Sequence, residues 1–236
     1  MGKTHFFLVN SEHFEVTYSE DHKSLKIVSK EDIRIENRIK TGIISLSPKN
    51  YAFIQPDTSL PFICAPIDKG YTGDLTLITS RPITIPKGYT FHLLEIVKSD
   101  EELKGLPMGM SVRKPAYKGD IGRDCYLTTG ANNPTDVQFV VQNHPGQLYF
   151  PRSSAAKKGY EVQVSSNVTV IRKSDLSLLT LEEAFSVIQL VKGNISLING
   201  DVKFVDGDLA HKLSEELNKK YDRGSKGEGS SDKRRK

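Results

Sequence analysis

Apolar positions along this chain fall into short runs, and clusters of turn-forming residues separate those runs. The runs are rich in Val, Ile, Leu, Thr and Tyr, and the separators are rich in Pro, Gly, Asn and Asp. This pattern is typical of β-sandwiches and small barrels. It predicts strands over residues 14–18, 25–28, 43–46, 75–78, 91–97, 137–141 and 168–171.

Strong helical periodicity is confined to one segment near the C-terminus. Leu209, Leu213 and Leu217 recur at every fourth position, which places them on one face of a helix. We therefore predict a short helix over residues 208–217 in a chain whose fold class is otherwise all-β.

The organisation of the chain follows from two changes in composition. Residues 98–115 are polar, contain two Gly and two Pro, and lack alternation. We predict a first half over residues 1–98, a connector over 99–115, a second half over 116–221, and a flexible tail rich in Gly, Ser and Lys over 222–236.

The two halves also resemble each other loosely. A Pro-x-[Thr/Ser]-Ser step occurs at residues 56–59 and again at 151–154. Each step is followed later by a strand-like run that ends in Leu94 or Leu190. This repetition is consistent with an internal duplication.

Composition and charge narrow the class of protein. The 236 residues are 37% hydrophobic and 26% charged, which suits a globular domain, and no apolar run approaches the ~20 residues of a membrane span. The N-terminal apolar stretch is too short for a signal peptide, so we expect an intracellular protein, neither secreted nor membrane-bound. Two cysteines, Cys64 and Cys125, fit a reducing compartment.

The net charge of +4 is carried by the tail, because residues 219–236 alone hold eight basic and three acidic residues. This is not the basic face of a nucleic-acid binder, and we expect no stable nucleic-acid partner. The terminal basic run of residues 233–236 fits a nuclear signal or an ordinary solvated tail.

The most informative segment is residues 65–75, Ala-Pro-Ile-Asp-Lys-Gly-Tyr-Thr-Gly-Asp-Leu. It lies between two strand-like runs, so we predict a hairpin that turns near Lys69 and Gly70. In isolation, Asp68 is more simply read as the cap of a common turn.

Four later segments carry further candidate chemistry. Residues 119–126 contain Asp124, and residues 184–191 contain Gln189 in an apolar run. Residues 150–159 place Arg152 beside two hydroxyls, a phosphate-binding combination. Residues 223–231 are glycine-rich, and successive N–H groups of such an arm wrap phosphates. Each segment alone also fits an ordinary turn, basic loop, buried strand or solvated tail.

Together the five segments resemble the five motifs of the dUTP pyrophosphatase (dUTPase) family. Their order, with the third motif first and then one, two, four and five, resembles the single-chain herpesvirus dUTPases. The resemblance implies two jelly-roll-like or β-barrel halves, a monomer in the host cytoplasm or nucleus, and Mg²⁺-dependent hydrolysis of dUTP to dUMP and pyrophosphate. That reaction limits uracil in DNA and supplies dUMP.

The resemblance also implies a role for each matching residue. Asp68 would activate the attacking water, Tyr71 would pack under the deoxyribose, and Asp124 would hold a water of the Mg²⁺ shell. Uracil would be read by the backbone of the hairpin. The substrate would be bound by Tyr71, Gly73, Arg152, Ser153, Ser154, Gln189, Arg223, Gly227 and Ser230.

Some positions depart from the family pattern. Ala65 replaces a usual Gly, and Glu228 replaces the Phe that stacks on uracil. The first half has Asp57 where the phosphate-binding Arg would stand, so its copy of that motif should not bind phosphate. These departures keep open a dUTPase-derived protein with weakened catalysis that acts through protein partners. The basic tail keeps open a third hypothesis, a nucleic-acid-binding β domain that uses this tail.

Overall fold

The computed structural model describes residues 4–21, 24–47, 51–57, 60–99, 110–112, 115–127, 139–142, 146–164, 167–172, 174 and 187–227. The strands of the first half are β1 (Thr4–Val9), β2 (Phe14–Ser19), β3 (Ser24–Ser29), β4 (Ile33–Ile35), β5 (Arg38–Lys40), β6 (Ile43–Ser45), β7 (Tyr51–Pro56), β8 (Pro66–Ile67), β9 (Thr76–Ile78), β10 (Ile83–Ile85) and β11 (Thr90–Lys98).

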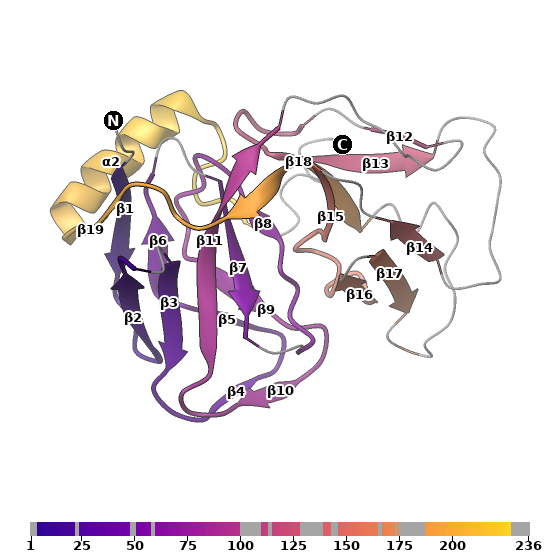
Figure 1. Ribbon diagram of the computed structural model, residues 1–236, viewed down its shortest axis with the longest axis horizontal. Helices are drawn as coiled ribbons and strands as arrows, with labels where there is room; N and C mark the ends of the chain where they lie inside the picture. The colour runs from indigo at the N-terminus through magenta and orange to yellow at the C-terminus, as the bar shows by residue number, and fades with distance from the viewer. Residues whose placement is uncertain are drawn as a thin grey trace.

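The rest of the described chain is also mostly strand (Figure 1). Its strands are β12 (Met110–Val112), β13 (Gly122–Leu127), β14 (Phe139–Gln142), β15 (Gln147–Pro151), β16 (Tyr160–Val164), β17 (Asn167–Arg172), β18 (Ile188–Ser196) and β19 (Asp201–Phe204). The helix α2 (Gly207–Lys220) follows them. The predicted all-β class with a C-terminal helix is confirmed, and strands cover the seven predicted segments to within about two residues wherever the structure describes them.

The centre of the fold is an antiparallel pair of long strands, β11 and β18, one from each half of the chain. They pair near their C-terminal ends, from Glu95 opposite Ser196 to Lys98 opposite Gly193. Nearer its N-terminal end, β11 pairs with β7, whereas β18 pairs with β15. Both halves therefore contribute to one sheet, and β18 crosses between the two lobes seen in Figure 1.

The larger hydrophobic core lies in the first half. Leu25, Ile27, Phe91 and Leu93 are fully buried there. A smaller cluster joins the halves, because the ring centroids of Phe53 and Phe150 lie 5.1 Å apart and other buried apolar side chains of both halves surround them. The contact between the halves is thus apolar, which stabilises their mutual placement.

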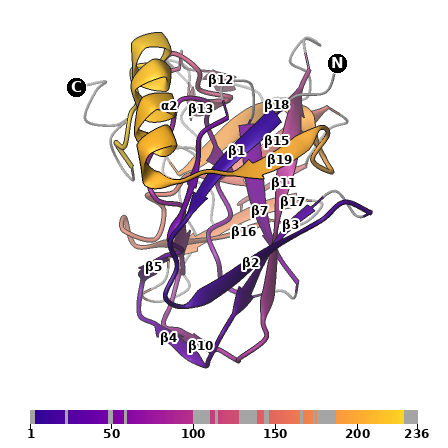
Figure 2. The same cartoon turned by 90° about the vertical axis from the view of Figure 1, so that its left-hand side faces the viewer.

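The C-terminal segment returns to the first half. Strand β19 pairs in parallel with β1, and α2 lies beside this pair (Figure 2). The helix buries Ala210 and Leu217 in a cluster that includes Leu46. The helix begins at a conventional cap, since Asp206 accepts a hydrogen bond from the Leu209 N–H at 2.8 Å. This return carries residues 221–227 toward the hairpin of residues 65–75. No helix in the described part of the chain is long and apolar enough to span a membrane.

Candidate functional site

The segment of residues 65–75 turns at Asp68–Tyr71, but its two arms are not a paired ladder. They meet at their base, where Phe62 bridges Thr79 and the Ile63 N–H donates to the Ile78 carbonyl at 2.7 Å. Beyond that point, the first arm pairs with β7 through β8, and the second arm pairs with β5 through β9. The arms therefore part, and side chains from both line one cavity.

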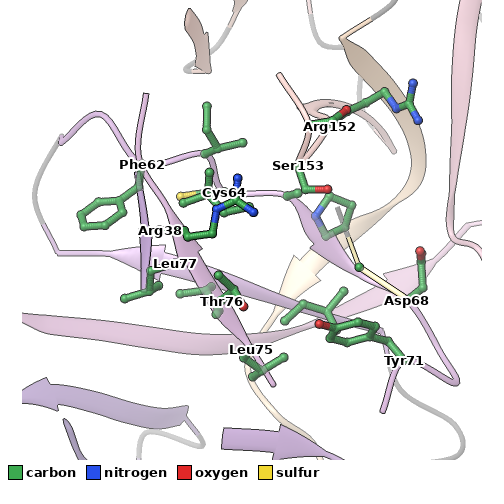
Figure 3. Close-up of a pocket in the computed structure, with 18 of the residues that line it drawn as sticks. Arg38, Phe62, Cys64, Asp68, Tyr71, Leu75, Thr76, Leu77, Arg152 and Ser153 are labelled. Atoms are coloured by element: carbon green, nitrogen blue, oxygen red, sulfur yellow. The ribbon is translucent and has the colours of Figure 1, made fainter. Parts of the chain in front are cut away.

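This cavity has a volume of about 390 Å³ and receives residues from distant parts of the sequence. Apolar side chains of the first half form much of its wall, including Phe62, Leu75 and Leu77. The second half and the C-terminal segment supply polar side chains (Figure 3). Eight of the predicted site residues line it: Asp68, Tyr71, Arg152, Ser153, Ser154, Gln189, Arg223 and Gly227.

Asp68 stands where the halves and the C-terminal segment meet. Its Oδ1 accepts a hydrogen bond from the Ile121 N–H at 2.9 Å, and its Oδ2 accepts one from Arg223 Nη1 at 2.8 Å. Only 12% of the Asp68 side chain and 15% of the Arg223 side chain are exposed. The carboxyl group is consequently fixed by groups that lie 53 and 155 residues away in the sequence.

Burial raises the pKa of Asp68 from its ordinary value of 3.8 to about 7. The Arg223 charge and the Ile121 N–H act in the opposite direction and lower the pKa, whereas the neighbouring Asp120 raises it. A carboxyl group whose pKa lies near neutrality is suited to accept a proton from a nearby water. Strong burial together with a specific charged partner in a cavity is typical of functional sites.

A second carboxyl group, Asp120, lies on the same side of the cavity. Its Oδ2 accepts hydrogen bonds from the Ala116 and Tyr117 N–H groups, both at 3.0 Å. Its Oδ1 is 3.5 Å from Arg223 Nη1 and finds no hydrogen-bond partner among the described residues. Arg223 therefore lies between two acidic side chains and partly neutralises both.

Residues 221–227 are held over the hairpin by several contacts. The Gly224 carbonyl accepts from the Thr72 N–H at 2.9 Å, and Asp222 Oδ1 accepts from the Lys118 N–H at 2.8 Å. The ring of Tyr221 fills a gap between two glycines of positive φ, because a Cβ on Gly70 or Gly119 would lie 2.5 Å or 2.7 Å from the nearest ring atom. Glycine is required at both positions by space as well as by backbone conformation.

Tyr71 occupies the turn of the hairpin beneath this segment. Its hydroxyl donates to the Asp74 carbonyl at 2.9 Å, and the Arg223 guanidinium carbon is 5.8 Å from its ring centroid. Gly73 does not line the cavity; a Cβ there would lie 2.6 Å from the Tyr71 hydroxyl. Gly73 acts by leaving room for the tyrosine ring.

The turn after β15 brings in the second half's polar groups. Arg152 is buried, and its backbone N–H donates a hydrogen bond to the Val187 carbonyl at 2.8 Å. Ser154 is only 3% exposed, and its hydroxyl has no hydrogen-bond partner among the described residues. Gln189 Nε2 approaches the Pro151 carbonyl at 3.4 Å, a weak contact. Arg152, Ser153 and Ser154 thus line one part of the cavity, and Figure 3 draws the Arg152 guanidinium group directed away from Ser153.

Two predicted residues lie outside what the structure describes in side-chain detail. The backbone of Asp124 lies in β13 opposite Gln189, but its side chain is outside the described part, and Ser230 and Glu228 lie beyond residue 227. Conversely, sequence reasoning missed Asp120, Tyr117, Tyr221 and Arg38. Asp120 belongs to the same Gly-Asp segment as Asp124, so the signal was present but was assigned to the neighbouring acid.

Whether the cavity suits Mg²⁺ depends on its acidic side chains. The described residues contain no group of three or more His, Cys, Asp or Glu side chains that could hold a metal ion. Mg²⁺ needs no such group when substrate phosphates and waters supply most of its ligands. The buried Asp120 Oδ1, which accepts no hydrogen bond from the described residues, is suited to receive one from a metal-bound water.

Comparison with known proteins gives no match to any protein-family model, and no curated protein sequence matches the chain.

Proposed function

We propose that this protein is a dUTP pyrophosphatase that cleaves dUTP to dUMP and pyrophosphate. The observation that supports this most directly is the convergence described above. Segments that resemble different dUTPase motifs and lie up to 155 residues apart line one cavity, and the side chains of Asp68 and Arg223 meet there at 2.8 Å.

The proposed reaction is attack of water on the α-phosphorus. Asp68 in its carboxylate form accepts one proton from the water while the water oxygen bonds to the α-phosphorus. The bond from that phosphorus to the oxygen bridging to the β-phosphorus breaks, and pyrophosphate leaves with the bonding electrons. The proton on Asp68 is later released to solvent, so one dUTP and one water give dUMP, pyrophosphate and a proton.

The two ends of the cavity suit the two ends of dUTP. Arg152, Ser153 and Arg223 gather donors suited to phosphate oxygens. The space between the parted arms is lined by apolar side chains and suits a flat base. Tyr71 lies beside Asp68 in Figure 3, and we propose that the deoxyribose packs on it. Bound Mg²⁺ would neutralise phosphate charge, with Asp120 and Asp124 as the acids available to hold its water shell.

The pairing of strands supports a duplicated, two-half architecture of the single-chain type. In β7, Pro56 lies opposite Phe91 of β11, and in β15, Pro151 lies opposite Ile188 of β18. The equivalent of Arg152 in the first half is then Asp57, whose Oδ1 lies 2.8 Å from His92 Nε2. A hydrogen-bonded Asp57–His92 pair thus lies in the first half where the second half has a candidate phosphate-binding arginine.

The proposal is tested by pyrophosphate release from purified protein with dUTP and Mg²⁺, compared with dCTP, dTTP and UTP. We expect turnover with strong preference for dUTP and loss of turnover when Mg²⁺ is chelated. Asp68→Asn should lower turnover by roughly 10²–10⁴-fold, because general-base catalysis contributes that much. Asp57→Asn is the matched control, since Asp57 lies outside the cavity lining and its loss should leave turnover unchanged.

Absence of dUTP turnover by the folded wild-type protein, or unchanged turnover in Asp68→Asn, would refute the proposal. Light scattering on the same sample measures the molecular mass, for which we expect the monomer mass of 26.3 kDa. A monomer follows from the proposal because one chain supplies both sides of the cavity.

A further inference from the structure

The ring of Tyr221 packs between the two turns that carry the acidic side chains of the cavity. Gly70 lies two residues after Asp68, and Gly119 directly precedes Asp120. A Cβ on Gly70 would lie 2.5 Å from Tyr221 Cγ, and one on Gly119 would lie 2.7 Å from Tyr221 Cδ1. The ring therefore packs against the backbone of both turns, and a side chain on either glycine would force it to shift.

Tyr221 also joins these turns to the end of α2. Its backbone N–H donates a hydrogen bond to the Leu217 carbonyl at 2.8 Å, and its side chain belongs to the apolar cluster that contains Leu46 and Leu217. Only 8% of Tyr221 is exposed. Arg223 follows two residues later, so the path of the chain into Arg223 starts from a buried, packed residue.

The position of Arg223 is exacting because its guanidinium group meets the same two turns. Its Nη1 lies 2.8 Å from Asp68 Oδ2 and 3.5 Å from Asp120 Oδ1. Its guanidinium carbon lies 5.2 Å from the ring centroid of Tyr117. A displacement of about 1 Å would take the contact with Asp68 out of hydrogen-bonding range.

We propose that Tyr221 is a positioning residue whose ring fixes Arg223 between Asp68 and Asp120. Its effect on catalysis rests on the proposed function, in which Arg223 binds phosphate oxygens beside the candidate base. A misplacement of about 1 Å can lower catalysis by roughly 100-fold. The Tyr221 hydroxyl is not among the atoms nearest either glycine, so the aromatic ring carries this role.

Two backbone amides report on the contact between residues 221–227 and the rest of the site. The Thr72 N–H donates a hydrogen bond to the Gly224 carbonyl at 2.9 Å, and the Lys118 N–H donates one to Asp222 Oδ1 at 2.8 Å. Displacement of the segment would break both bonds. Hydrogen exchange at these two reporter amides therefore measures the position of the segment without any nucleotide.

We expect Tyr221→Ala to accelerate exchange at the Thr72 and Lys118 amides by roughly tenfold relative to the Ile63 amide at the base of the hairpin. Tyr221→Phe keeps the ring and should exchange as wild type does. Leu217→Ala is the matched control, because it removes a buried side chain of the same apolar cluster and keeps the Tyr221 ring. It should lower the urea midpoint of unfolding without accelerating the two reporter amides relative to Ile63.

The effect on catalysis is measured as a double-mutant cycle. Tyr221→Ala and Arg223→Gln should each lower kcat/KM for dUTP by about 10–100-fold, and the double variant should fall no further than Arg223→Gln alone. Tyr221→Phe and Leu217→Ala should keep kcat/KM close to that of wild type. A purely structural role for Tyr221 would make the losses of the two single variants multiply.

The outcomes separate the two proposals. If wild type turns over dUTP, and Tyr221→Ala leaves the reporter amides unchanged or the losses multiply in the double variant, only the Tyr221 inference is wrong. If wild type turns over no dUTP, the proposed function fails, and the exchange rates decide whether Tyr221 positions Arg223. Tyr221→Val keeps an apolar side chain but lacks the ring atoms that approach Gly119, so it gives the same measurements if the Ala variant folds poorly.

Discussion

Compared with wild type, the Asp68→Asn variant should become relatively more stable as pH rises from acid to neutral. A buried carboxyl group whose folded pKa is about 7, against an ordinary 3.8, resists ionisation in the folded state. The stability that the Asp68 carboxyl group contributes is therefore fully present below the unfolded pKa and is lost as pH rises from about 4 to 7, because Asp68 holds its proton in the folded state over that range. Asn does not titrate, so the variant lacks this loss.

The magnitude follows from the difference between the two pKa values. A difference of roughly 3 corresponds to about 4 kcal/mol in total, and about 3 kcal/mol of this falls between pH 5 and 8. The quantity to measure is the free energy of unfolding of Asp68→Asn minus that of wild type, at pH 5, 6, 7 and 8. The difference should increase with pH by about that amount.

Urea denaturation followed by far-UV circular dichroism gives these free energies. Ser153→Ala is the matched control, because it changes a polar side chain of the same cavity that does not titrate. Its unfolding free energy should keep the wild-type pH dependence. A difference between Asp68→Asn and wild type that is constant across pH 5–8 would show that Asp68 ionises as readily in the folded protein as in the unfolded chain.

Three further predictions concern the same region. Arg223→Gln removes a charge that lowers the Asp68 pKa, so the rise of dUTP turnover with pH should shift to higher pH in a pH–rate profile. Tyr71→Phe should cost about 1 kcal/mol in urea denaturation through the lost hydroxyl hydrogen bond, whereas Tyr71→Ala should also reduce the preference for dUTP over UTP in turnover assays. Gly119→Ala should lower the free energy of unfolding by about 1–3 kcal/mol, because φ is +102° and the new methyl group would lie 2.7 Å from the Tyr221 ring. Gly88→Ala, where φ is +85° and the space is open, should lower it by about 1 kcal/mol. Equal costs at the two glycines would show that close packing contributes nothing at Gly119.

Local patterns in the sequence were enough to predict seven of the described strands and the helix. The period of Leu209, Leu213 and Leu217 predicted a helix that the structure places at Gly207–Lys220. Alternating apolar runs predicted β11, whose Phe91 and Leu93 are fully buried. Such signals are local, because each depends on which face of one element is apolar.

Tertiary relations were harder to predict from the chain alone. Nothing near Arg223 indicates that it contacts Asp68, since the contact depends on how α2 returns to the first half. The turn of residues 65–75 was predicted, but the parting of its arms depends on the partners that β8 and β9 find elsewhere. Arg38 belongs to none of the motif-like segments, and only the pairing of β5 with β9 shows that it lines the cavity. Long-range pairing therefore decides these features of the site.

The distance in sequence between Asp68 and Arg223 has a consequence for synthesis of the protein. A ribosome must add 155 residues after the candidate base before its arginine partner exists. Until then the nascent chain carries an acidic hairpin whose charge lacks this neutralising partner, so nascent chains that end before residue 223 should bind triphosphates poorly. Completion of the site is thereby tied to the synthesis of Arg223.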